Sequence, residues 1–453
     1  MSIYQGWIND LSKYADLPCI DDADQCYSYT QLLTEIACWR QKLSALRISP
    51  GDVIGIRCDY SLASIAALLA LFLERAIVAL IPRGGDSKRY VAESHARAII
   101  ELSSDGRFEF RPLPVEGRVI SPLIVRLMTE CSAGFVIFTS GSTSNPKAAL
   151  HSVERFVKRF RKPARRFRTI AFSTMDHIAG MDTMFHTLSS GGALILTRSR
   201  KPLDVMRLIE TRSVEALPTS PSFLRTLCEA QSIHTFDCSS LKIIAYGSEP
   251  MDQRTLTRLL GMFPNRELLQ KYGSTELGAP RTVSRGNGSL WLKFREPDVE
   301  VKVVDGVLWT RTPHSSLGYL NMPSTLDGEG WYCTEDMVET DGEWIRFLGR
   351  SGERINVGGE KVSPTEVEDT IRELEFVRDV LVFGETHALL GEVVAARVVV
   401  APRDDDANRT IRQDVRNHCR SRLPLFKVPM RISVVDCIAI TDRQKRRRRP
   451  MDH

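Results

Sequence analysis

Two features common in extracellular and membrane proteins are missing from this sequence: paired cysteines and a long apolar run. Its ten cysteines are scattered singly from Cys19 to Cys437 with no C-x-x-C pair. We therefore expect no zinc site and no disulfide framework, and a reducing cytoplasm suits the chain. The longest apolar stretch, residues 62–81, is interrupted by Glu74 and Arg75, which favours a buried helix and a strand over a membrane span. The first residues lack the basic and apolar segments of a signal peptide, so we expect a cytoplasmic protein.

A strong charge of one sign is also missing. The chain has 61 basic and 56 acidic residues, a net charge of +5 over 453 residues, which gives no reason to expect a nucleic-acid partner. The basic run at residues 445–449 is by itself typical of a solvated terminus or of a nucleic-acid contact. An apolar fraction of 43% and a charged fraction of 26% indicate a soluble globular protein, and the length predicts two or three domains.

Hydrophobic periodicity indicates an α/β fold. Between residues 29 and 46, apolar side chains recur at helical spacing at Leu32, Ile36, Trp39 and Leu43. A short apolar strand at 53–56, a helix at 62–73 and a strand at 76–81 follow. Helices and apolar strands continue to alternate up to the strand at 135–138, which predicts a layered domain with largely parallel sheets.

A polar segment with the chemistry of a polyphosphate site follows the strand at 135–138. Small hydroxyls and backbone N–H groups in a tight turn can surround phosphoryl oxygens, and a lysine adds positive charge. An ordinary polar surface turn is the alternative. A Walker A loop is disfavoured, because Pro146 and Ala148 stand where that loop needs glycine and a hydroxyl. The segment consists of Thr139, Ser140, Gly141, Ser142, Thr143, Ser144, Asn145, Pro146 and Lys147.

Two further segments have the composition of ligand-binding turns. The strand at 241–246 ends in Gly247, Ser248 and Glu249; a strand that opens into glycine often lies at a ligand-binding sheet edge, although many such turns bind nothing. In the second segment, Tyr272-Gly273-Ser274-Thr275-Glu276, a carboxylate beside a hydroxyl and a glycine can hold Mg²⁺ and contact a phosphate.

The C-terminal quarter reads as a separate module. Residues 347–362 are punctuated by glycine, as in a hinge, and Pro364, Glu366 and Glu368 suit the first turns of a helix. Apolar strands at 380–383 and 393–400 and a helix at 409–423 follow. These elements predict an α+β module of about a hundred residues.

The order of these motifs resembles the adenylate-forming superfamily, which includes acyl- and aryl-CoA synthetases, nonribosomal peptide adenylation domains and firefly luciferase. The segment 139–147 is similar to its phosphate-binding motif, 272–276 to Y-G-x-T-E, 332–336 to Y-x-T-G-D and the end of the chain to P-x-T-x-x-G-K-x-x-R. The chain departs from the usual glycines at Ser144, Ala148, Glu335 and Gln444 and from the usual proline at Ala439.

The resemblance implies a large N-terminal domain of layered helices and mostly parallel sheets, residues 1–350, and a small mobile α+β lid, residues 351–453. Gly352 would be the hinge, where Asp or Lys is usual. Lys445 would be the catalytic lysine of the lid, although the substitutions beside it make this the least secure assignment. Because Arg446 is its neighbour, a shift of the alignment by one residue would still leave a cation there.

The resemblance also implies roles for the motif residues. Thr139 to Lys147 would hold the pyrophosphate, and Glu276 would carry Mg²⁺ beside Thr275. Asp336 would accept the two ribose hydroxyls, as a carboxylate does well; a solvated turn aspartate is the alternative. The remaining nucleotide contacts would come from Gly247, Ser248, Glu249, Tyr272, Gly273, Ser274 and Arg350. The acid pocket would be lined by His177, Gly180 and Tyr246; His177 is as readily explained as a structural histidine.

The implied activity is an ATP-dependent ligase that activates an aryl or acyl carboxylate as acyl-AMP, releases pyrophosphate and transfers the acyl group to the thiol of coenzyme A. The phosphopantetheine of a carrier protein is the alternative acceptor. Asp176 could bind the ammonium of an amino-acid substrate, but the residues after it favour acyl or aryl acids. A non-catalytic adenylate-binding relative and a luciferase-like oxygenase are the competing functions. We expect a monomer or a homodimer.

Overall fold

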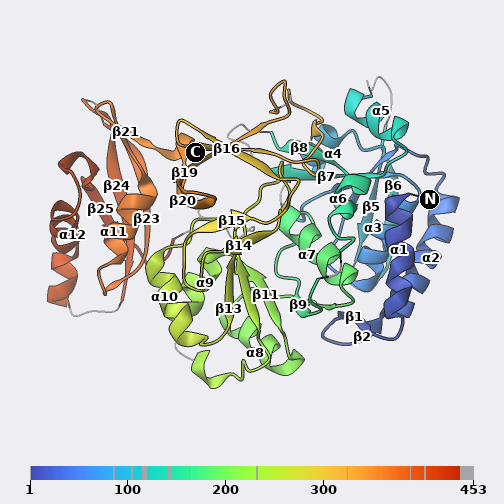
Figure 1. Cartoon of the computed structure of the whole chain (residues 1–453), viewed down its shortest axis with the longest axis horizontal. Helices are drawn as coiled ribbons and strands as arrows, with labels where there is room; N and C mark the ends of the chain where they lie inside the picture. The colour runs from blue at the N-terminus through green and yellow to red at the C-terminus, as the bar shows by residue number, and fades with distance from the viewer. Residues whose placement is uncertain are drawn as a thin grey trace.

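The computed structural model describes residues 2–84, 87–103, 106–114, 120–139, 145–162, 164–230, 233–323, 325–387, 389–401 and 405–438. Figure 1 shows two sheet-and-helix layers, which contain most of the first 290 residues. It also shows an upper strand-rich part and, at the left, a small C-terminal module.

The first layer is a seven-stranded sheet of order β18-β8-β7-β4-β3-β5-β6. Its central strands run parallel, whereas β6, β8 and β18 are antiparallel to their neighbours. The strands are β3 (Val53–Arg57), β4 (Ile77–Leu80), β5 (Ala98–Leu102), β6 (Phe108–Pro112), β7 (Gly134–Thr139), β8 (Lys147–Ser152) and β18 (Gly318–Tyr319). The helices of this region are α1 (Ile3–Asp10), α2 (Tyr29–Ala45), α3 (Leu62–Leu73), α4 (Ser87–Ser94), α5 (Pro122–Thr129) and α6 (Val153–Lys158), with the 3₁₀ turn η1 (Leu11–Tyr14).

The second layer is a seven-stranded sheet of order β13-β12-β11-β9-β10-β1-β2, parallel except for the β1–β2 pair. Its strands are β1 (Pro18–Asp21), β2 (Cys26–Ser28), β9 (Arg168–Ile170), β10 (Ala193–Ile195), β11 (Ala216–Thr219), β12 (Ile243–Tyr246) and β13 (Glu267–Gln270). Its helices are α7 (Ile178–Ser189), α8 (Pro202–Arg212), α9 (Pro221–Glu229) and α10 (Gln253–Met262), with η2 (Ile233–Thr235).

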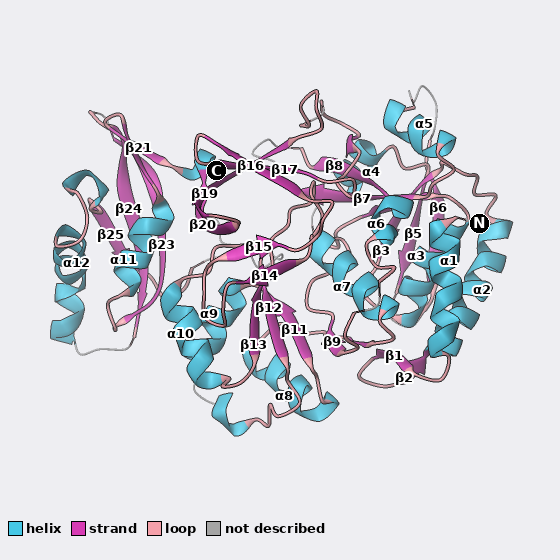
Figure 2. Cartoon of the chain, in the orientation of Figure 1, coloured by secondary structure: helices cyan, strands magenta, loops and turns pink. Residues whose placement is uncertain are grey.

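The third sheet is antiparallel throughout, with the order β14-β15-β20-β19-β17-β16. Figure 2 shows its strands above the second layer and next to the final module. The prediction of mostly parallel sheets therefore describes the first two sheets and misses this one. Its strands are β14 (Thr282–Ser284), β15 (Leu292–Phe294), β16 (Glu300–Val304), β17 (Val307–Arg311), β19 (Tyr332–Asp341) and β20 (Trp344–Arg350).

The small C-terminal module is a five-stranded sheet with two helices. The strand order is β22-β21-β24-β23, and β25 pairs in parallel with β24. The elements are η3 (Ser351–Glu353), β21 (Ile355–Val357), β22 (Glu360–Val362), α11 (Pro364–Arg372), β23 (Val377–His387), β24 (Gly391–Val400), α12 (Asp405–Arg420), η4 (Leu425–Lys427) and β25 (Arg431–Val434). The predicted α+β character is confirmed. The exact boundary at 350/351 stays a prediction.

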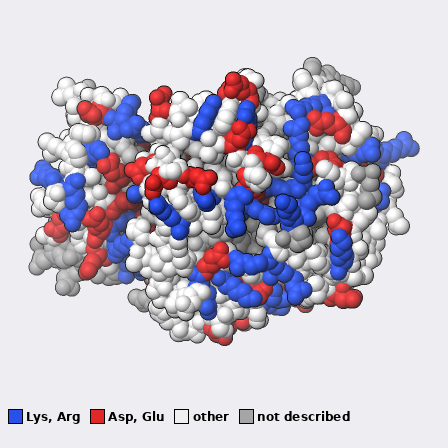
Figure 3. Space-filling view, in the orientation of Figure 1, with Lys and Arg blue, Asp and Glu red and all other residues white. Residues whose placement is uncertain are grey.

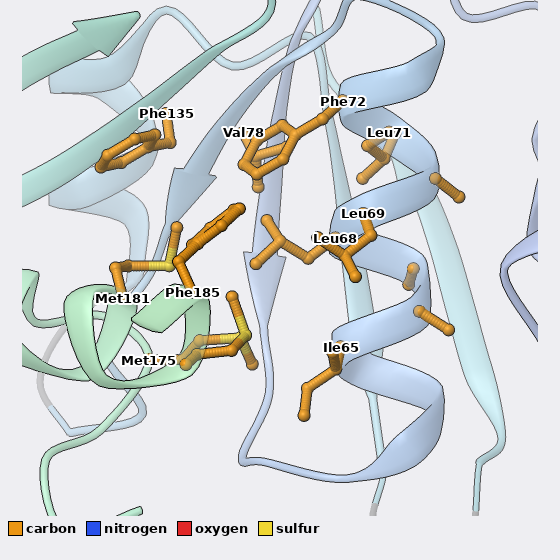
Figure 4. Packing of buried hydrophobic residues seen from close by; sticks show 14 of the residues in the cluster. Ile65, Leu68, Leu69, Leu71, Phe72, Val78, Phe135, Met175, Met181 and Phe185 are labelled. Atoms are coloured by element: carbon orange, nitrogen blue, oxygen red, sulfur yellow. The ribbon is translucent and has the colours of Figure 1, made fainter. Parts of the chain in front are cut away.

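The core of the first layer forms around helix α3. A capping box between Ser61 and Ser64 begins this helix, and its apolar residues pack toward β4 and α7. In Figure 4, Leu68 and Phe72 lie near Val78 of β4, with Phe185 of α7 beyond it. Each such fully buried side chain contributes about 1.5–3 kcal/mol to folding. No helix in the described part of the chain is long and apolar enough to cross a membrane.

One arginine of the large domain holds the C-terminal module. Arg254 of α10 donates to the carbonyls of Arg372, Leu374 (3.0 Å), Glu375 (3.2 Å) and Val377 (3.2 Å). These carbonyls lie at the end of α11 and just after it, where helical carbonyls lack intrahelical partners and attract a cation. Arg254 thus fixes the orientation in which α11 faces the large domain.

Replacing Arg254 with alanine should loosen this contact. We expect amide hydrogen exchange at residues 372–377 to rise about tenfold or more, since several charge-assisted hydrogen bonds are lost. Arg207→Ala is the control, because Arg207 is exposed and pairs with Asp204 of the same helix, α8, at 3.7 Å. Equal exchange in the two variants would contradict this role.

Candidate active site

A cleft of about 2660 Å³ lies between the sheets and is closed on one side by α11 of the C-terminal module. Its lining includes residues from the ends of β7, β12 and β13, from β19 and β20, and from α7. Figure 3 shows Lys and Arg side chains gathered near the middle of the face drawn in Figure 1. Thr139, Glu276 and Asp336, which belong to three of the motifs singled out in the sequence, therefore line one cavity.

The predicted phosphate loop connects two antiparallel strands. Thr139, the last residue of β7, pairs in register with Lys147, the first residue of β8, and both line the cleft. Asn321 holds the outgoing end: its amide oxygen accepts from the Ala148 N–H (3.0 Å) and its amide nitrogen donates to the Pro146 carbonyl (2.8 Å). The predicted residues Ser140, Gly141, Ser142 and Thr143 lie outside the described residues.

Two tyrosine hydroxyls interact with the carboxylate of Glu276. The Tyr319 hydroxyl donates to its carboxylate, and the Tyr332 hydroxyl also interacts with it. Burial and the Glu276 charge raise the pKa of both tyrosines, so both stay protonated donors at neutral pH. The Lys147 ammonium lies 5.9 Å from the centre of the Tyr319 ring. These contacts link the phosphate loop to the carboxylate predicted to carry Mg²⁺.

The donor set suits Mg²⁺ of a nucleotide. In the described part of the chain, no group of three or more His, Cys, Asp or Glu could hold a metal ion. Mg²⁺ prefers oxygen ligands and commonly takes one or two carboxylates together with water and substrate phosphates. Glu276 fits that pattern, with phosphates as the remaining ligands. The assignment stays a prediction.

The carboxylate of Asp336 is fixed from two sides. The Tyr272 hydroxyl donates to one oxygen at 2.6 Å, and Arg350 Nε donates to the other at 3.2 Å. The Tyr272 ring stacks on Phe347, with 4.3 Å between the ring centroids. Each carboxylate oxygen can accept a further hydrogen bond. Asp336 is therefore preorganised to accept hydroxyl groups, as the predicted ribose role requires.

The turn after β12 is closely packed, and next to it lies a buried hydrogen-bond acceptor. A Cβ at Gly247 would lie 2.7 Å from the Lys271 carbonyl oxygen, and Ser248 has a φ of 74°. Glu249 accepts from Ser222 and Arg225 through one oxygen. Its other oxygen is buried and has no hydrogen-bond partner in the described structure. A ligand with an N–H group, such as the amino group of adenine, would satisfy it.

The segment 273–278 is a rigid turn. The Ser274 N–H donates to the Gly278 carbonyl at 3.1 Å, and the Gly278 N–H donates to the Ser274 carbonyl at 2.9 Å. A Cβ at Gly273 would lie 2.3 Å from the Gly278 carbonyl oxygen, so glycine is required for this closure. The turn fixes Thr275 and Glu276 at the cleft wall.

The three residues predicted for the acid pocket differ in their positions relative to the cleft. His177 lines the cleft, but its Nδ1 also accepts from the Ala179 N–H at 3.2 Å and so caps α7. Tyr246, at the end of β12, is buried and lines the cleft. Gly180 is not part of the lining: a Cβ there would lie 2.0 Å from the Thr174 carbonyl oxygen. Gly180 packs α7 closely on the preceding turn, and its place in the acid pocket stays a prediction.

The hinge and the lysine of the lid remain predictions. Gly352 lies in η3 with a φ outside the left-handed region, and a Cβ there would meet nothing within 4 Å. This conformation therefore does not itself require glycine. Lys445 and Gln444 lie outside the described residues.

Several site residues were missed or left unassigned in the sequence. Tyr319 and Asn321 lie outside the motifs described above, and Tyr332 belongs to the Y-x-T-G-D match. Their contacts with Glu276 and with the loop have no signal in spacing. Glu335 has a φ of 62°, which explains why glycine suits that position.

The chain belongs to the AMP-binding enzyme family. The model of that family matches residues 85–320, and the model of the AMP-binding enzyme C-terminal domain matches residues 366–445. It is an adenylate-forming ligase family, so the predicted class of protein is confirmed.

Two curated relatives and one solved structure illustrate the likeness. Phenyloxazoline synthase MbtB of Mycobacterium tuberculosis is 25% identical, over 98% of this chain and 34% of its own length. The medium/long-chain-fatty-acid–CoA ligase FadD8 of the same organism is 26% identical, over 78% of this chain and 65% of its own length. The chain therefore spans about a third of the length of MbtB and just under two thirds of the length of FadD8. The amide bond synthetase McbA from Marinactinospora thermotolerans has a TM-score of 0.81 at 22% identity, over 98% of each chain, which shows a shared fold.

The packing role of Gly180 can be tested with a matched glycine. We expect Gly180→Ala to lower the free energy of unfolding by about 2 kcal/mol or more, because the added methyl overlaps a backbone carbonyl. In Gly261→Ala, within α10, the new methyl meets nothing within 4 Å, and alanine should stabilise the helix by about 0.5–1 kcal/mol. Urea midpoints measure both changes. Equal midpoints would show that Gly180 is not tightly packed.

Proposed function

We propose that this protein is an ATP-dependent acid–thiol ligase, which converts a carboxylic acid to acyl-AMP and pyrophosphate and then transfers the acyl group to the thiol of coenzyme A. The observation that carries the proposal is the meeting of two preorganised carboxylates in one cleft. Glu276 is held by Tyr319, and Asp336 is held by Tyr272 and Arg350. The first suits a metal-bound phosphate and the second a ribose.

In the first half-reaction, an oxygen of the substrate carboxylate attacks the α-phosphorus of ATP, and the bond to the β-phosphate oxygen breaks to release pyrophosphate. Both reactants are anions, so the site must offset charge repulsion and hold the attack in line. Lys147 and the loop 139–147 would hold the leaving pyrophosphate. Glu276 would keep the metal ion on the phosphates, and Lys445 would bridge the carboxylate and the α-phosphate.

In the second half-reaction, a thiol attacks the acyl carbon of acyl-AMP. The C–S bond forms, AMP leaves and the thiol proton passes to solvent. We propose that the lid turns about Gly352 between the two steps, removing Lys445 and admitting the thiol. Arg254, which bonds the end of α11, would release the lid during that turn.

The acceptor is the least supported part of the proposal. The relative FadD8, a fatty-acid–CoA ligase, supports coenzyme A, and the phosphopantetheine arm of a carrier protein is the alternative. The structural neighbour McbA is an amide bond synthetase, so an amine acceptor belongs among the assays. An aryl or medium acyl acid is the substrate class we expect.

The function is tested by acid-dependent pyrophosphate release from Mg·ATP, over a panel of benzoates, cinnamates, fatty acids and amino acids. Each acid is assayed alone, with coenzyme A and with an amine. Release that depends on both the acid and coenzyme A would support the full proposal. ATP binding without release for any acid would contradict it and favour a non-catalytic relative.

Lys445→Ala should separate the half-reactions. We expect adenylate formation to fall by about a hundredfold or more, because one preorganised cation is lost from the transition state, whereas thiolysis of supplied acyl-AMP should continue. Arg446→Ala is the control and should keep adenylate formation. Loss of both half-reactions in Lys445→Ala, or loss of adenylation in Arg446→Ala instead, would overturn the assignment of Lys445.

A further inference from the structure

A second group of polar side chains lines the cleft along α7 and just after β13. Asp182 and His186 lie one helical turn apart on α7, and Lys271 follows the end of β13. The Lys271 ammonium lies 3.9 Å from Asp182 Oδ2. From His177, which begins α7, to His186 the helix rises about 13 Å, so the group lies along one wall of the cleft.

Part of this group is internal structure. Arg159, whose side chain is only 5% exposed, lies 3.2 Å from Asp182 and 3.7 Å from Glu296, and it also donates to the Ala279 carbonyl. The backbone N–H of Arg281 donates to the Glu296 carboxylate at 2.9 Å. These contacts tie α7 to the end of α6 and to the segment after β15. They account for Arg159 and Glu296 without any ligand, whereas Asp182 Oδ1 is buried and has no hydrogen-bond partner in the described structure.

Lys271 is not accounted for in this way. Its ammonium has three donors, yet it makes no hydrogen bond to another described residue, and the ion pair with Asp182 is long. Its side chain is 30% exposed and faces the cleft. An acceptor on a bound molecule could therefore reach it without displacing a protein partner.

Two buried polar atoms beside it also lack partners. Thr187 and Gln270 are 3% and 6% exposed and line the cleft. Neither the Thr187 hydroxyl nor the Gln270 amide oxygen has a hydrogen-bond partner in the described structure. An alkyl chain packed here would leave both atoms unpaired. The Thr187 hydroxyl can donate to an acidic group of the substrate, whereas the Gln270 amide oxygen is an acceptor and needs a donor, such as a bridging water.

The charge balance favours an anion. Three cations, Arg159, Lys271 and Arg281, and the Asp182 carboxylate act electrostatically on His186, and Glu296 lies 3.7 Å from Arg159. Burial lowers the pKa of His186 to about 4, so its imidazole is neutral at pH 7 and can donate as well as accept. The three cations and two carboxylates together give this partly buried site a net charge of +1.

We infer that this wall binds a second acidic group on the substrate, so that the ligase takes carboxylic acids bearing a further carboxylate, with Lys271 as the residue that selects them. The inference rests on the proposed function and names its substrate class. It disfavours unsubstituted fatty acids, in contrast to the substrates named for FadD8.

The test compares matched acids in the pyrophosphate assay: hexanoate with adipate, and benzoate with isophthalate. We expect kcat/KM for the dicarboxylate of each pair to exceed that of the monocarboxylate by at least about tenfold, since a charge-assisted contact contributes about 1.5–3 kcal/mol. In Lys271→Met, which keeps the length of the side chain and removes its charge, this ratio should fall by a similar factor. Lys242→Met is the control, because Lys242 is exposed and pairs with Glu215 outside the cleft.

A binding measurement separates this inference from the proposed function. Adipate and isophthalate, each added with a non-hydrolysable ATP analogue, should raise the melting temperature of the wild-type protein more than hexanoate and benzoate do, and Lys271→Met should remove the difference. Pyrophosphate release with equal or better use of the monocarboxylates would overturn the inference and leave the ligase function intact. Dicarboxylate binding through Lys271 without pyrophosphate release would support the site and overturn the ligase function.

Discussion

The burial of Phe185 on α7 is the packing interaction on which the site depends. This ring is fully buried and contacts Trp7 of α1 and Phe156 of α6, with centroid distances of 4.9 and 5.5 Å. The aromatic cluster anchors α7 to the first layer. Asp182 and His186 of the same helix line the cleft. A side chain can be placed accurately at a ligand only if the element that carries it is rigid, and Phe185 supplies that rigidity.

Within the cleft, tyrosine hydroxyls and arginines hold the carboxylates. Tyr319 holds Glu276, and Tyr272 with Arg350 holds Asp336. A neutral hydroxyl can orient a carboxylate without cancelling its charge, so Glu276 keeps its attraction for a cation. Because the pKa of each tyrosine is raised by burial and by the neighbouring carboxylate, the hydroxyls remain donors over the physiological pH range. Preorganisation of this kind removes reorganisation cost from the reaction.

The C-terminal module contributes residues to the same cleft. Thr365, Glu368, Asp369 and Arg372 of α11 line it, and Arg254 holds the end of that helix. A contact made by one guanidinium with backbone carbonyls depends little on side-chain sequence in the module. Such a contact could break and reform, as the proposed turn of the lid requires.

The local order of elements was predictable from the sequence because it depends on neighbouring residues. The spacing of Leu32, Ile36 and Trp39 predicted α2, and the run before Thr139 predicted β7. The motifs around Thr139, Glu276 and Asp336 indicated nucleotide chemistry, because hydroxyls, a lysine and carboxylates suit phosphate, Mg²⁺ and ribose. A glycine beside a histidine suggested access for a ligand at Gly180, and the sequence could not show that its neighbour in the fold is the Thr174 carbonyl. Tertiary structure alone decided which hydroxyl holds Glu276, that the third sheet is antiparallel, and that Lys271 lies beside Asp182, because each depends on segments that are distant in the chain and meet only when the layers pack.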